Sequence, residues 1–417
     1  MKADRLFLAS RIATCAPGTR PRSGKDARDA GVILDGALAT KHGRVAWVGR
    51  RDEVAVIEAD EVVDFSDSCI IPGLVDCHTH PVWGGSRIDE FIARGQGATY
   101  LDLHRAGGGI LSTVRATRAL PFAEALAHTV CVFERMRAHG TTTVEAKSGY
   151  GLDIETELRD LRVLRAAANA TGMEMVATCL AAHAIPPEFT HNREGYIDLV
   201  INEILVRVAS ERLAAFCDVF CEDGAFDLEE SRRILTAARS LGLKLKIHAE
   251  EFAYLGGARM AGELGAVSAD HLLSLPQTDF EALRQSGTVA VVLPATTMFL
   301  GKTTYAPARG LIDAGVPVAI ATDFNAGSCM TESLPAALSI AVLQMGLTPE
   351  EALLGATVNA AHALGLGHDR GSLEVGRRAD FVVLAMKDPR EWLYHFGVNL
   401  VASVWSGGQR AGGNHAD

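Results

Sequence analysis

The sequence predicts an α/β fold: a (β/α)8 barrel of the TIM type, with a small β-sandwich domain built from both ends of the chain. Two observations lead to this prediction. Eight short apolar segments with strand character alternate with amphipathic helical stretches through the middle of the chain. Brief strand-like segments flank this region on both sides. We expect the N-terminal part of the sandwich at residues 1–67, the barrel at 68–366 and the C-terminal part of the sandwich at 367–417.

Short β-like segments separated by turns dominate the N-terminal region. They cover residues 6–8, 32–34, 37–39, 45–48 and 62–65. The C-terminal region offers similar segments at 371–376, 379–385 and 401–408. Either set alone would be a thin sheet, and two separate β-appendages would leave more unpaired edges. We therefore expect the two ends to pair into one domain.

The barrel strands are expected in the middle of the chain. The first ends near Asp76, and the others cover 143–146, 175–180, 217–221, 243–247, 266–269, 289–293 and 316–321. Amphipathic helical stretches such as 122–138, 155–170, 228–241 and 280–285 fall between most of them. In such a barrel the functional groups gather at the C-terminal ends of the strands.

Composition excludes several classes of protein. The 417 residues are 48% hydrophobic and 22% charged, which is typical of a globular protein. With a net charge of −11 and no basic stripe, nucleic acid is not an expected partner. The eight cysteines form no Cys-x-x-Cys pair, which favours reduced thiols in a cytoplasmic protein. The first residues have too short an apolar core for a signal peptide, and no apolar run is long enough to span a membrane.

The segment 71–80 carries the strongest functional signal. His78 and His80 follow an apolar strand and lie two residues apart, so both imidazoles can point to the same side. A His-x-His pair alone is often incidental. His248, His271 and Asp323, however, fall at the ends of three further predicted strands. Each of these has an ordinary explanation, as a core histidine or a helix-capping aspartate, but five such residues at strand ends indicate one site.

We interpret His78, His80, His248 and Asp323 as ligands of a single metal ion. Imidazoles and a carboxylate suit zinc or iron equally, so the metal can be divalent or trivalent. A metal here would lower the pKa of a bound water towards ~7. Glu251 follows in the loop beyond the same strand as His248 and is the candidate general acid–base group. Glu250 is the competing candidate, and both could also be solvated loop acids.

Further side chains near the strand ends could bind a substrate. A guanidinium can hold a carboxylate bidentately, and the loop after Asp323 offers an amide, a backbone approach and a hydroxyl. For each of these residues, packing or surface exposure is an equally good explanation. The two glycine-rich loops, 106–109 and 147–151, lack the nucleotide-binding patterns. The candidates are Arg87, Tyr100, Tyr150, His183, Asn325, Gly327 and Ser328.

Several longer segments together resemble a known family. They are residues 72–80, 105–110, 112–118, 145–152, 268–272 and 321–328. The chain resembles the amidohydrolase superfamily and, within it, the imidazolonepropionase family of histidine degradation. The His-x-His pair marks only the superfamily, whereas Gly-Gly-Gly-Ile and Lys-Ser-Gly-Tyr-Gly-Leu are much more specific.

The resemblance implies a reaction and roles for residues. The reaction is hydrolysis of the anionic ring compound 4-imidazolone-5-propanoate to N-formimidoyl-L-glutamate, the third step of histidine degradation. One zinc or iron is implied, with a cytoplasmic location and, by analogy, a homodimer. The implied metal ligands are His78, His80, His248 and Asp323; the implied catalytic residues are Glu251, His271 and Asp323; and the implied substrate contacts are Arg87, Tyr100, Tyr150, His183, Glu251, Asn325, Gly327 and Ser328.

Three alternatives stay open on the sequence. An amidohydrolase-type deaminase of a nucleobase or another aminated heterocycle would share the metal residues. A non-catalytic metal-binding barrel would keep the metal and lack turnover. Lys147 and Glu222 could support a second metal ion, although the family resemblance favours a single one.

Overall fold

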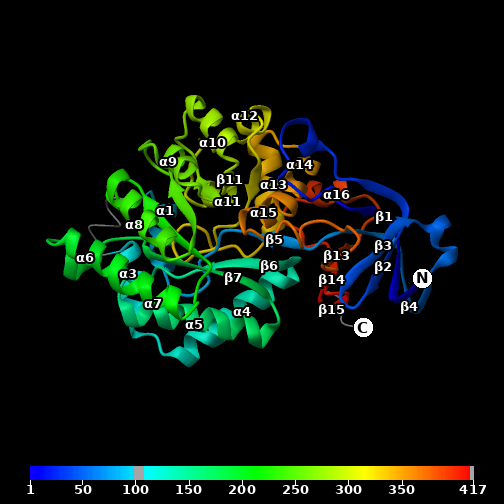
Figure 1. The fold of residues 1–417 in the computed structure, drawn as a ribbon, viewed down its shortest axis with the longest axis horizontal. Coiled ribbons are helices and arrows are strands. Elements are labelled where there is room, and N and C mark those ends of the chain that lie inside the picture. The colour runs from blue at the N-terminus through cyan, green and yellow to red at the C-terminus, as the bar shows by residue number, and fades with distance from the viewer. Residues whose placement is uncertain (98–107, 414–417) are drawn as a thin grey trace.

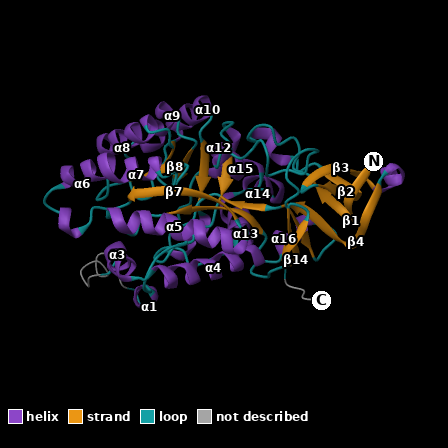
Figure 2. Cartoon of the chain, turned by 60° about the horizontal axis from the view of Figure 1, so that its bottom comes forward, coloured by secondary structure: helices purple, strands orange, loops and turns teal. Residues whose placement is uncertain are grey.

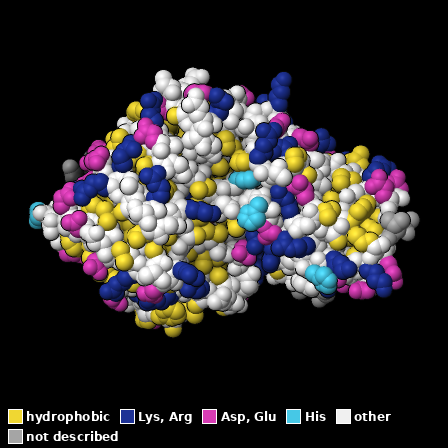
Figure 3. Space-filling model, viewed as in Figure 1, with side chains coloured by type: hydrophobic (Ala, Val, Ile, Leu, Met, Phe, Trp, Pro, Cys, Tyr) yellow, Lys and Arg dark blue, Asp and Glu magenta, His cyan; other side chains and the backbone are white. Residues whose placement is uncertain are grey.

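The computed structural model describes residues 1–97 and 108–413. Two sheets organise these residues, one inside the larger body and one at the end of the molecule that carries both chain termini (Figure 1). Acidic and basic side chains are interspersed over the face shown in Figure 3. Among the described helices, none is both long and apolar enough to cross a membrane.

The larger sheet has eight strands in the sequential order β5 to β12, and all neighbouring strands are parallel. The two outer strands meet beyond their C-terminal ends through a parallel bridge between Thr79 and Phe324. The backbone N–H of His80 donates to Phe324 O at 2.8 Å there. The predicted barrel is therefore confirmed. Its strands are β5 (Leu74–Asp76), β6 (Thr141–Lys147), β7 (Glu174–Ala182), β8 (Phe216–Cys221), β9 (Lys244–Ala249), β10 (Ser268–His271), β11 (Val289–Val292) and β12 (Val318–Ile320).

Helices surround the barrel strands, as Figure 2 shows. The helix after β8 begins at a capping box, in which Asp227 accepts from the N–H of Glu230 and Glu230 accepts from the N–H of Asp227. Helices that contact the barrel strands include α4 (Phe122–Ala138), α5 (Ile154–Thr171), α8 (Leu228–Ser240), α9 (Gly257–Leu264), α12 (Ala308–Asp313), α13 (Leu334–Met345), α14 (Pro349–Gly355) and α15 (Val358–Ala363). The other described helices are α1 (Ile88–Gly95), α3 (Ile110–Ala119), α6 (Arg193–Leu199), α7 (Leu205–Ser210), α10 (Phe280–Ser286), α11 (Pro294–Phe299) and α16 (Pro389–Tyr394).

The smaller sheet combines strands from both chain ends, as expected. Its seven strands lie in the order β15-β14-β13-β4-β1-β2-β3. The junction between the two ends is the antiparallel pairing of β4 with β13, for example Ile70 with Val383. The bounds are β1 (Lys2–Ala13), β2 (Val32–Lys41), β3 (Arg44–Arg50), β4 (Glu58–Pro72), β13 (Phe381–Leu384), β14 (Val401–Ser406) and β15 (Gln409–Gly412).

The small domain expected from both chain ends is built on one continuous sheet that curls back on itself. The start of β3 reaches the segment before β13, where Val45 N–H donates to Arg377 O at 2.9 Å. Curling lets side chains from distant strands share one core, in which Phe7, Phe381 and Trp405 pack with ring centroids 4.8 to 5.6 Å apart. A sandwich-like core thus forms within a single hydrogen-bonded sheet.

Strand β4 connects the small sheet to the barrel. This strand stays in the small sheet through Pro72, and β5 begins at Leu74. Only Gly73 separates the two strands, and a Cβ on it would lie 2.7 Å from Cγ2 of Thr142 on β6. The small sheet therefore leads directly into β5, the strand that precedes the two histidines.

Candidate active site

The barrel brings together all five residues that were predicted at strand ends. His78 and His80 follow β5, His248 and His271 lie in β9 and β10, and Asp323 follows β12. Nε2 of His78 lies 3.3 Å from Nε2 of His80. Oδ1 of Asp323 lies 3.6 Å from the first of these nitrogens and 3.4 Å from the second. The rings of His248 and His271 have their centroids 5.1 Å apart, and all five side chains are buried.

These groups have the chemistry and spacing of a metal site. Ligand atoms of His78, His80 and Asp323 lie within 4.8 Å of one another, and so do those of His78, His248 and His271. Two nitrogens bound to one zinc ion at about 2.1 Å lie roughly 3.4 Å apart in a tetrahedral site. Nε2 of His248 is buried without a hydrogen-bond partner, which is costly unless another group satisfies it. The residues present therefore fit a bound metal ion.

Carboxylates lie next to the far nitrogens of two of these histidines. Nδ1 of His78 lies 2.6 Å from Oδ2 of Asp270, and Nδ1 of His248 lies 3.0 Å from Oδ2 of Asp218. Asp323 is held in turn by Thr296, whose hydroxyl donates to Oδ2 at 2.7 Å. The ligand groups are thus oriented by partners that sequence reasoning missed.

A layer of buried charge lies beneath the histidines. We call Glu145, Lys147, Asp218, Lys246 and Asp270 the charged layer; all five side chains are fully buried. The alternation of side chains along a strand is the sequence signal that could have revealed these residues. Residues 145 and 147 on β6 share a face, and residue 246 on β9 shares its face with the candidate ligand two positions later.

The second metal site considered for Lys147 and Glu222 does not form among the described residues. Burial alone would lower the pKa of Lys147, but Asp218 and Glu145 raise it above its usual value, so the side chain is a cation. Glu222 accepts hydrogen bonds from the backbone N–H groups of Phe252 at 2.9 Å and Ala253 at 3.0 Å. In the described part of the chain, Glu222 belongs to no group of histidine, cysteine or carboxylate side chains close enough to share a metal ion.

The geometry separates Glu251 from its competitor Glu250. The carboxylate of Glu250 accepts from the N–H groups of residues 256–258 at 2.7 to 2.9 Å and so caps the start of α9. Oε2 of Glu251 instead lies 3.7 Å from Nδ1 of His271. Burial, with the charge of Asp323, raises the pKa of Glu251 to about 8, whereas burial lowers the pKa of His271 to about 3. A carboxyl group near its titration point therefore faces a neutral imidazole.

Left-handed backbone conformations mark three of the strand ends. Glu250 has a φ of 55°, His271 of 79°, Leu272 of 64° and Asp323 of 53°. Such conformations are uncommon for residues other than glycine and persist where surrounding contacts fix them. They occur here at residues that turn the chain beyond β9, β10 and β12, which points to a constrained site.

Tyr150 and His183 form one wall beside the histidines. The ring of His80 lies 5.4 Å from His183 and 6.0 Å from Tyr150, measured between centroids. Nδ1 of His183 lies 3.0 Å from the carbonyl oxygen of Gly149 and can donate to it. Burial raises the pKa of Tyr150, and burial lowers the pKa of His183 well below its usual value. Both side chains are therefore neutral polar groups next to the candidate ligands.

Arg87 is also near the site and is already paired. Its Nε and Nη2 donate to the two carboxylate oxygens of Glu90 at 3.1 and 2.7 Å. The guanidinium lies against Gly327, where an added Cβ would sit 2.5 Å from Cζ of Arg87. A second guanidinium, that of Arg94, donates to the carbonyl oxygen of Gly327 at 3.2 Å. Two predicted substrate contacts, Arg87 and Gly327, therefore lie against each other.

Asn325 and Ser328 organise the loop after Asp323. The Asn325 amide donates to Asp323 O at 2.7 Å and accepts from the N–H groups of Gly327 and Ser328, both at 2.8 Å. The Ser328 hydroxyl also lies 2.8 Å from Asn325 Nδ2. In this structure these groups hold one another. Tyr100, the remaining candidate, lies outside the described residues.

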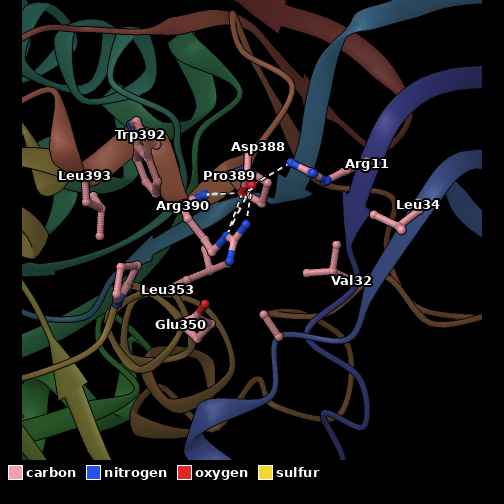
Figure 4. Close-up of a pocket in the computed structure, with 12 residues that line it drawn as sticks. Arg11, Val32, Leu34, Glu350, Leu353, Asp388, Pro389, Arg390, Trp392 and Leu393 are labelled. Carbon is pink, nitrogen blue, oxygen red and sulfur yellow. Dashed lines mark hydrogen bonds and ion pairs between the residues drawn. The ribbon is translucent and has the colours of Figure 1, made fainter.

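A separate cavity lies between the small sheet and the barrel (Figure 4). It has a volume of about 240 Å³ and is lined by residues of β1, α14 and α16 and by Val32 and Leu34 of β2. Arg11 and Arg390 both pair with Asp388 there, each at 2.6 Å. None of the candidate site residues lines this cavity.

Comparison with known proteins places the chain in a family. The Amidohydrolase family model matches residues 69–411. An imidazolonepropionase of Syntrophobacter fumaroxidans is 46% identical over 405 residues, covering 96% of this chain and 95% of the relative. One from Symbiobacterium thermophilum is also 46% identical, covering 95% and 94%.

Solved structures share the fold at much lower identity. An adenosine deaminase from Xanthomonas campestris with bound zinc has a TM-score of 0.74 at 20% identity, covering 98% of this chain and 93% of its own. The guanine deaminase of E. coli has a TM-score of 0.71 at 18% identity, covering 97% and 98%. The chain belongs to the amidohydrolase family and, within it, to the imidazolonepropionases.

Proposed function

We propose that this enzyme hydrolyses 4-imidazolone-5-propanoate to N-formimidoyl-L-glutamate, the third step of histidine degradation. The observation that carries the proposal is the buried cluster of His78, His80, His248 and Asp323 beside Glu251, in a chain 46% identical to imidazolonepropionases over nearly its whole length. In the reaction, the oxygen of water bonds to the ring carbonyl carbon, the bond from that carbon to a ring nitrogen breaks, and the nitrogen receives a proton.

We assign His78, His80, His248 and Asp323 as the metal ligands. A bound zinc or iron ion would polarise the substrate carbonyl and lower the pKa of water. Both metals accept imidazole and carboxylate ligands, so either is compatible with this donor set. Metal analysis of the purified protein, followed by reconstitution with Zn²⁺ or Fe²⁺, would identify the active metal.

Glu251 is the proposed proton carrier. Its carboxylate lies 3.7 Å from Nδ1 of His271, and a carboxyl group with a pKa of about 8 can both accept and donate a proton near neutral pH. His271 is neutral, so its imidazole can stabilise negative charge on the carbonyl oxygen through a hydrogen bond. Asp323 completes the catalytic set as a ligand and as a neighbouring carboxylate.

The remaining candidates are proposed to hold the substrate. Arg87 supplies the cation for the propionate, while Tyr150 and His183 face the ring from the wall beside His80. The loop containing Asn325, Gly327 and Ser328 shapes the pocket next to Arg87, and Tyr100 is retained as a contact on the family resemblance. The substrate of a nucleobase deaminase is an uncharged ring without a carboxylate, so it has no anionic group for Arg87 to bind. The need for a substrate carboxylate separates the proposed hydrolysis from nucleobase deamination.

The deciding experiment follows loss of the ring's ultraviolet absorbance when the enzyme is added to freshly prepared 4-imidazolone-5-propanoate. Metal-dependent loss, with formimidoylglutamate as product, is expected. The Glu251→Gln variant should retain its metal and lose at least ~100-fold in kcat, because general acid–base catalysis contributes about that much. Glu250→Gln is the matched control. No turnover by the fully metallated wild-type enzyme would refute the proposed reaction.

The assignment as an imidazolonepropionase also supports proposals about the cellular location, the assembly and the partners of the enzyme. We propose a cytoplasmic homodimer that acts on a small molecule and does not bind nucleic acid. Light scattering after size-exclusion chromatography measures the mass directly. The proposed domain limits at residues 67 and 366 can be tested by limited proteolysis.

A further inference from the structure

The charged layer connects two candidate metal ligands through the barrel interior. Lys147 Nζ lies 2.8 Å from Asp218 and 2.9 Å from Glu145 Oε1. Lys246 Nζ lies 3.1 Å from Glu145 Oε2 and 3.7 Å from Asp270. An alternating series of anion and cation therefore runs from Asp218 to Asp270 across β8, β6, β9 and β10.

Each end of this series contacts one histidine at Nδ1. Asp270 meets His78 and Asp218 meets His248, at 2.6 and 3.0 Å. Asp270 as a carboxylate can only accept, so its hydrogen bond places the proton of His78 on Nδ1 and leaves a lone pair on Nε2, the atom close to His80. Nδ1 of His248 lies within 3.0 Å of Asp218, although the contact is not a well-aligned hydrogen bond, and Nε2 of His248 is buried without a partner. Asp270 therefore selects which nitrogen of His78 is available to bind, and Asp218 is placed to do the same for His248.

The lysines supply the partners that two fully buried carboxylates need. An isolated buried carboxylate is strongly disfavoured unless it is paired and hydrogen-bonded. Lys147 and Lys246 each touch two carboxylates, and Lys246 also donates to the carbonyl oxygen of Cys77 at 2.8 Å. That residue directly precedes His78. The charged layer therefore contacts both the backbone just before His78, through Lys246, and the imidazole of His78, through Asp270.

We propose that Asp218 and Asp270 are positioning residues that fix the tautomer and ring orientation of His248 and His78, with Lys147, Glu145 and Lys246 holding the two carboxylates in place. The inference rests on the proposed metal ligands and deepens that assignment. It does not depend on the identity of the substrate. None of the layer residues is assigned a contact with substrate.

Metal affinity tests this role independently of turnover. In Asp270→Asn and Asp218→Asn, the dissociation constant for Zn²⁺, measured by competition with a chromophoric chelator, should rise about 10- to 100-fold. Asp160→Asn is the matched control, because Asp160 is also fully buried and paired with an arginine, 2.7 Å away, but lies on α5. It should bind Zn²⁺ with unchanged affinity.

A purely structural role would give a different pattern. The variants would then lose thermal stability in the metal-free state, as Asp160→Asn is expected to do, while Zn²⁺ affinity stayed within twofold of wild type. That result would overturn the proposal. Failure of the imidazolone assay with normal metal affinities in wild type would refute the proposed function and leave this inference intact.

A second measurement reads the tautomers directly in the wild-type protein. Long-range ¹H–¹⁵N spectra of metal-free protein labelled with ¹⁵N-histidine distinguish the two tautomers of a neutral imidazole. Signals assigned to His78 and His248 through His78→Gln and His248→Gln should show the proton on Nδ1. Protons on Nε2 in both residues would contradict the proposal.

Discussion

Replacing Arg87 by glutamine should weaken substrate binding far more than it slows the chemical step. The guanidinium is mostly buried, with a side chain 15% exposed, so its charge acts in a poorly solvated place. Truncating one partner of such a charge pair costs at least about 2 kcal/mol, which corresponds to roughly 30-fold in affinity. The proposed carboxylate partner is remote from the bond that breaks. KM should therefore rise by about 30-fold with kcat nearly unchanged.

The test of Arg87 must take Glu90 into account, because Glu90 accepts hydrogen bonds from two donors of Arg87. Arg87→Gln also strands the Glu90 carboxylate, so part of any defect could come from local disorder. The double variant Arg87→Gln/Glu90→Gln removes the stranded charge and should regain stability while KM stays high. Arg87→Lys keeps the charge, loses the planar fork and should be intermediate. Steady-state kinetics decides the matter: a KM within twofold of wild type in Arg87→Gln would refute the carboxylate-binding role.

Two further predictions concern the fold. Hydrogen bonding by Arg390, with the nearby charge of Arg11, lowers the pKa of Asp388 from 3.8 to about 2. The stabilisation is complete above about pH 4 and is lost as the pH falls towards 2. Asp388→Asn should therefore lower the free energy of unfolding in urea by up to about 2 kcal/mol at pH 7 and have little effect near pH 2. An equal effect at pH 7 and near pH 2 would contradict this origin. Separately, Cys131 is the one exposed thiol of the eight, and burial raises the pKa of others such as Cys179 to about 12. Ellman's reagent at pH 8 should modify one thiol rapidly in native protein and none in Cys131→Ser; rapid modification of several would argue against the buried positions.

Patterns that depend on local periodicity were predictable from the sequence. The helices α4 and α8 were expected at 122–138 and 228–241 and lie at Phe122–Ala138 and Leu228–Ser240, because each has an apolar stripe and polar flanks. The apolar helix α13 (Leu334–Met345) was not anticipated. Eight of its residues are buried, so it lacks the polar face that reveals a surface helix.

The ligand residues were predictable because parallel strands present their C-terminal ends at one edge. The partners of those ligands were harder to find, since they depend on which strands face each other across the barrel. Asp270 directly precedes His271 in sequence, yet its contact is with His78 on another strand. Likewise, sequence alone could not separate Glu250 from Glu251, because the difference lies in the backbone turn after β9 that directs Glu250 to the start of α9.

The pairing of β4 with β13 has a consequence for synthesis on the ribosome. Once β1 and β2 have emerged, β4 can join them on one side, because β1 pairs with both strands. The other edge of β4, which includes Ile70 and Ile71, gains its partner only after the whole barrel has been translated. An unpaired apolar edge of this kind is a template for intermolecular association. Nascent chains stalled before residue 381 should therefore be the aggregation-prone species, and those extended through β14 should not.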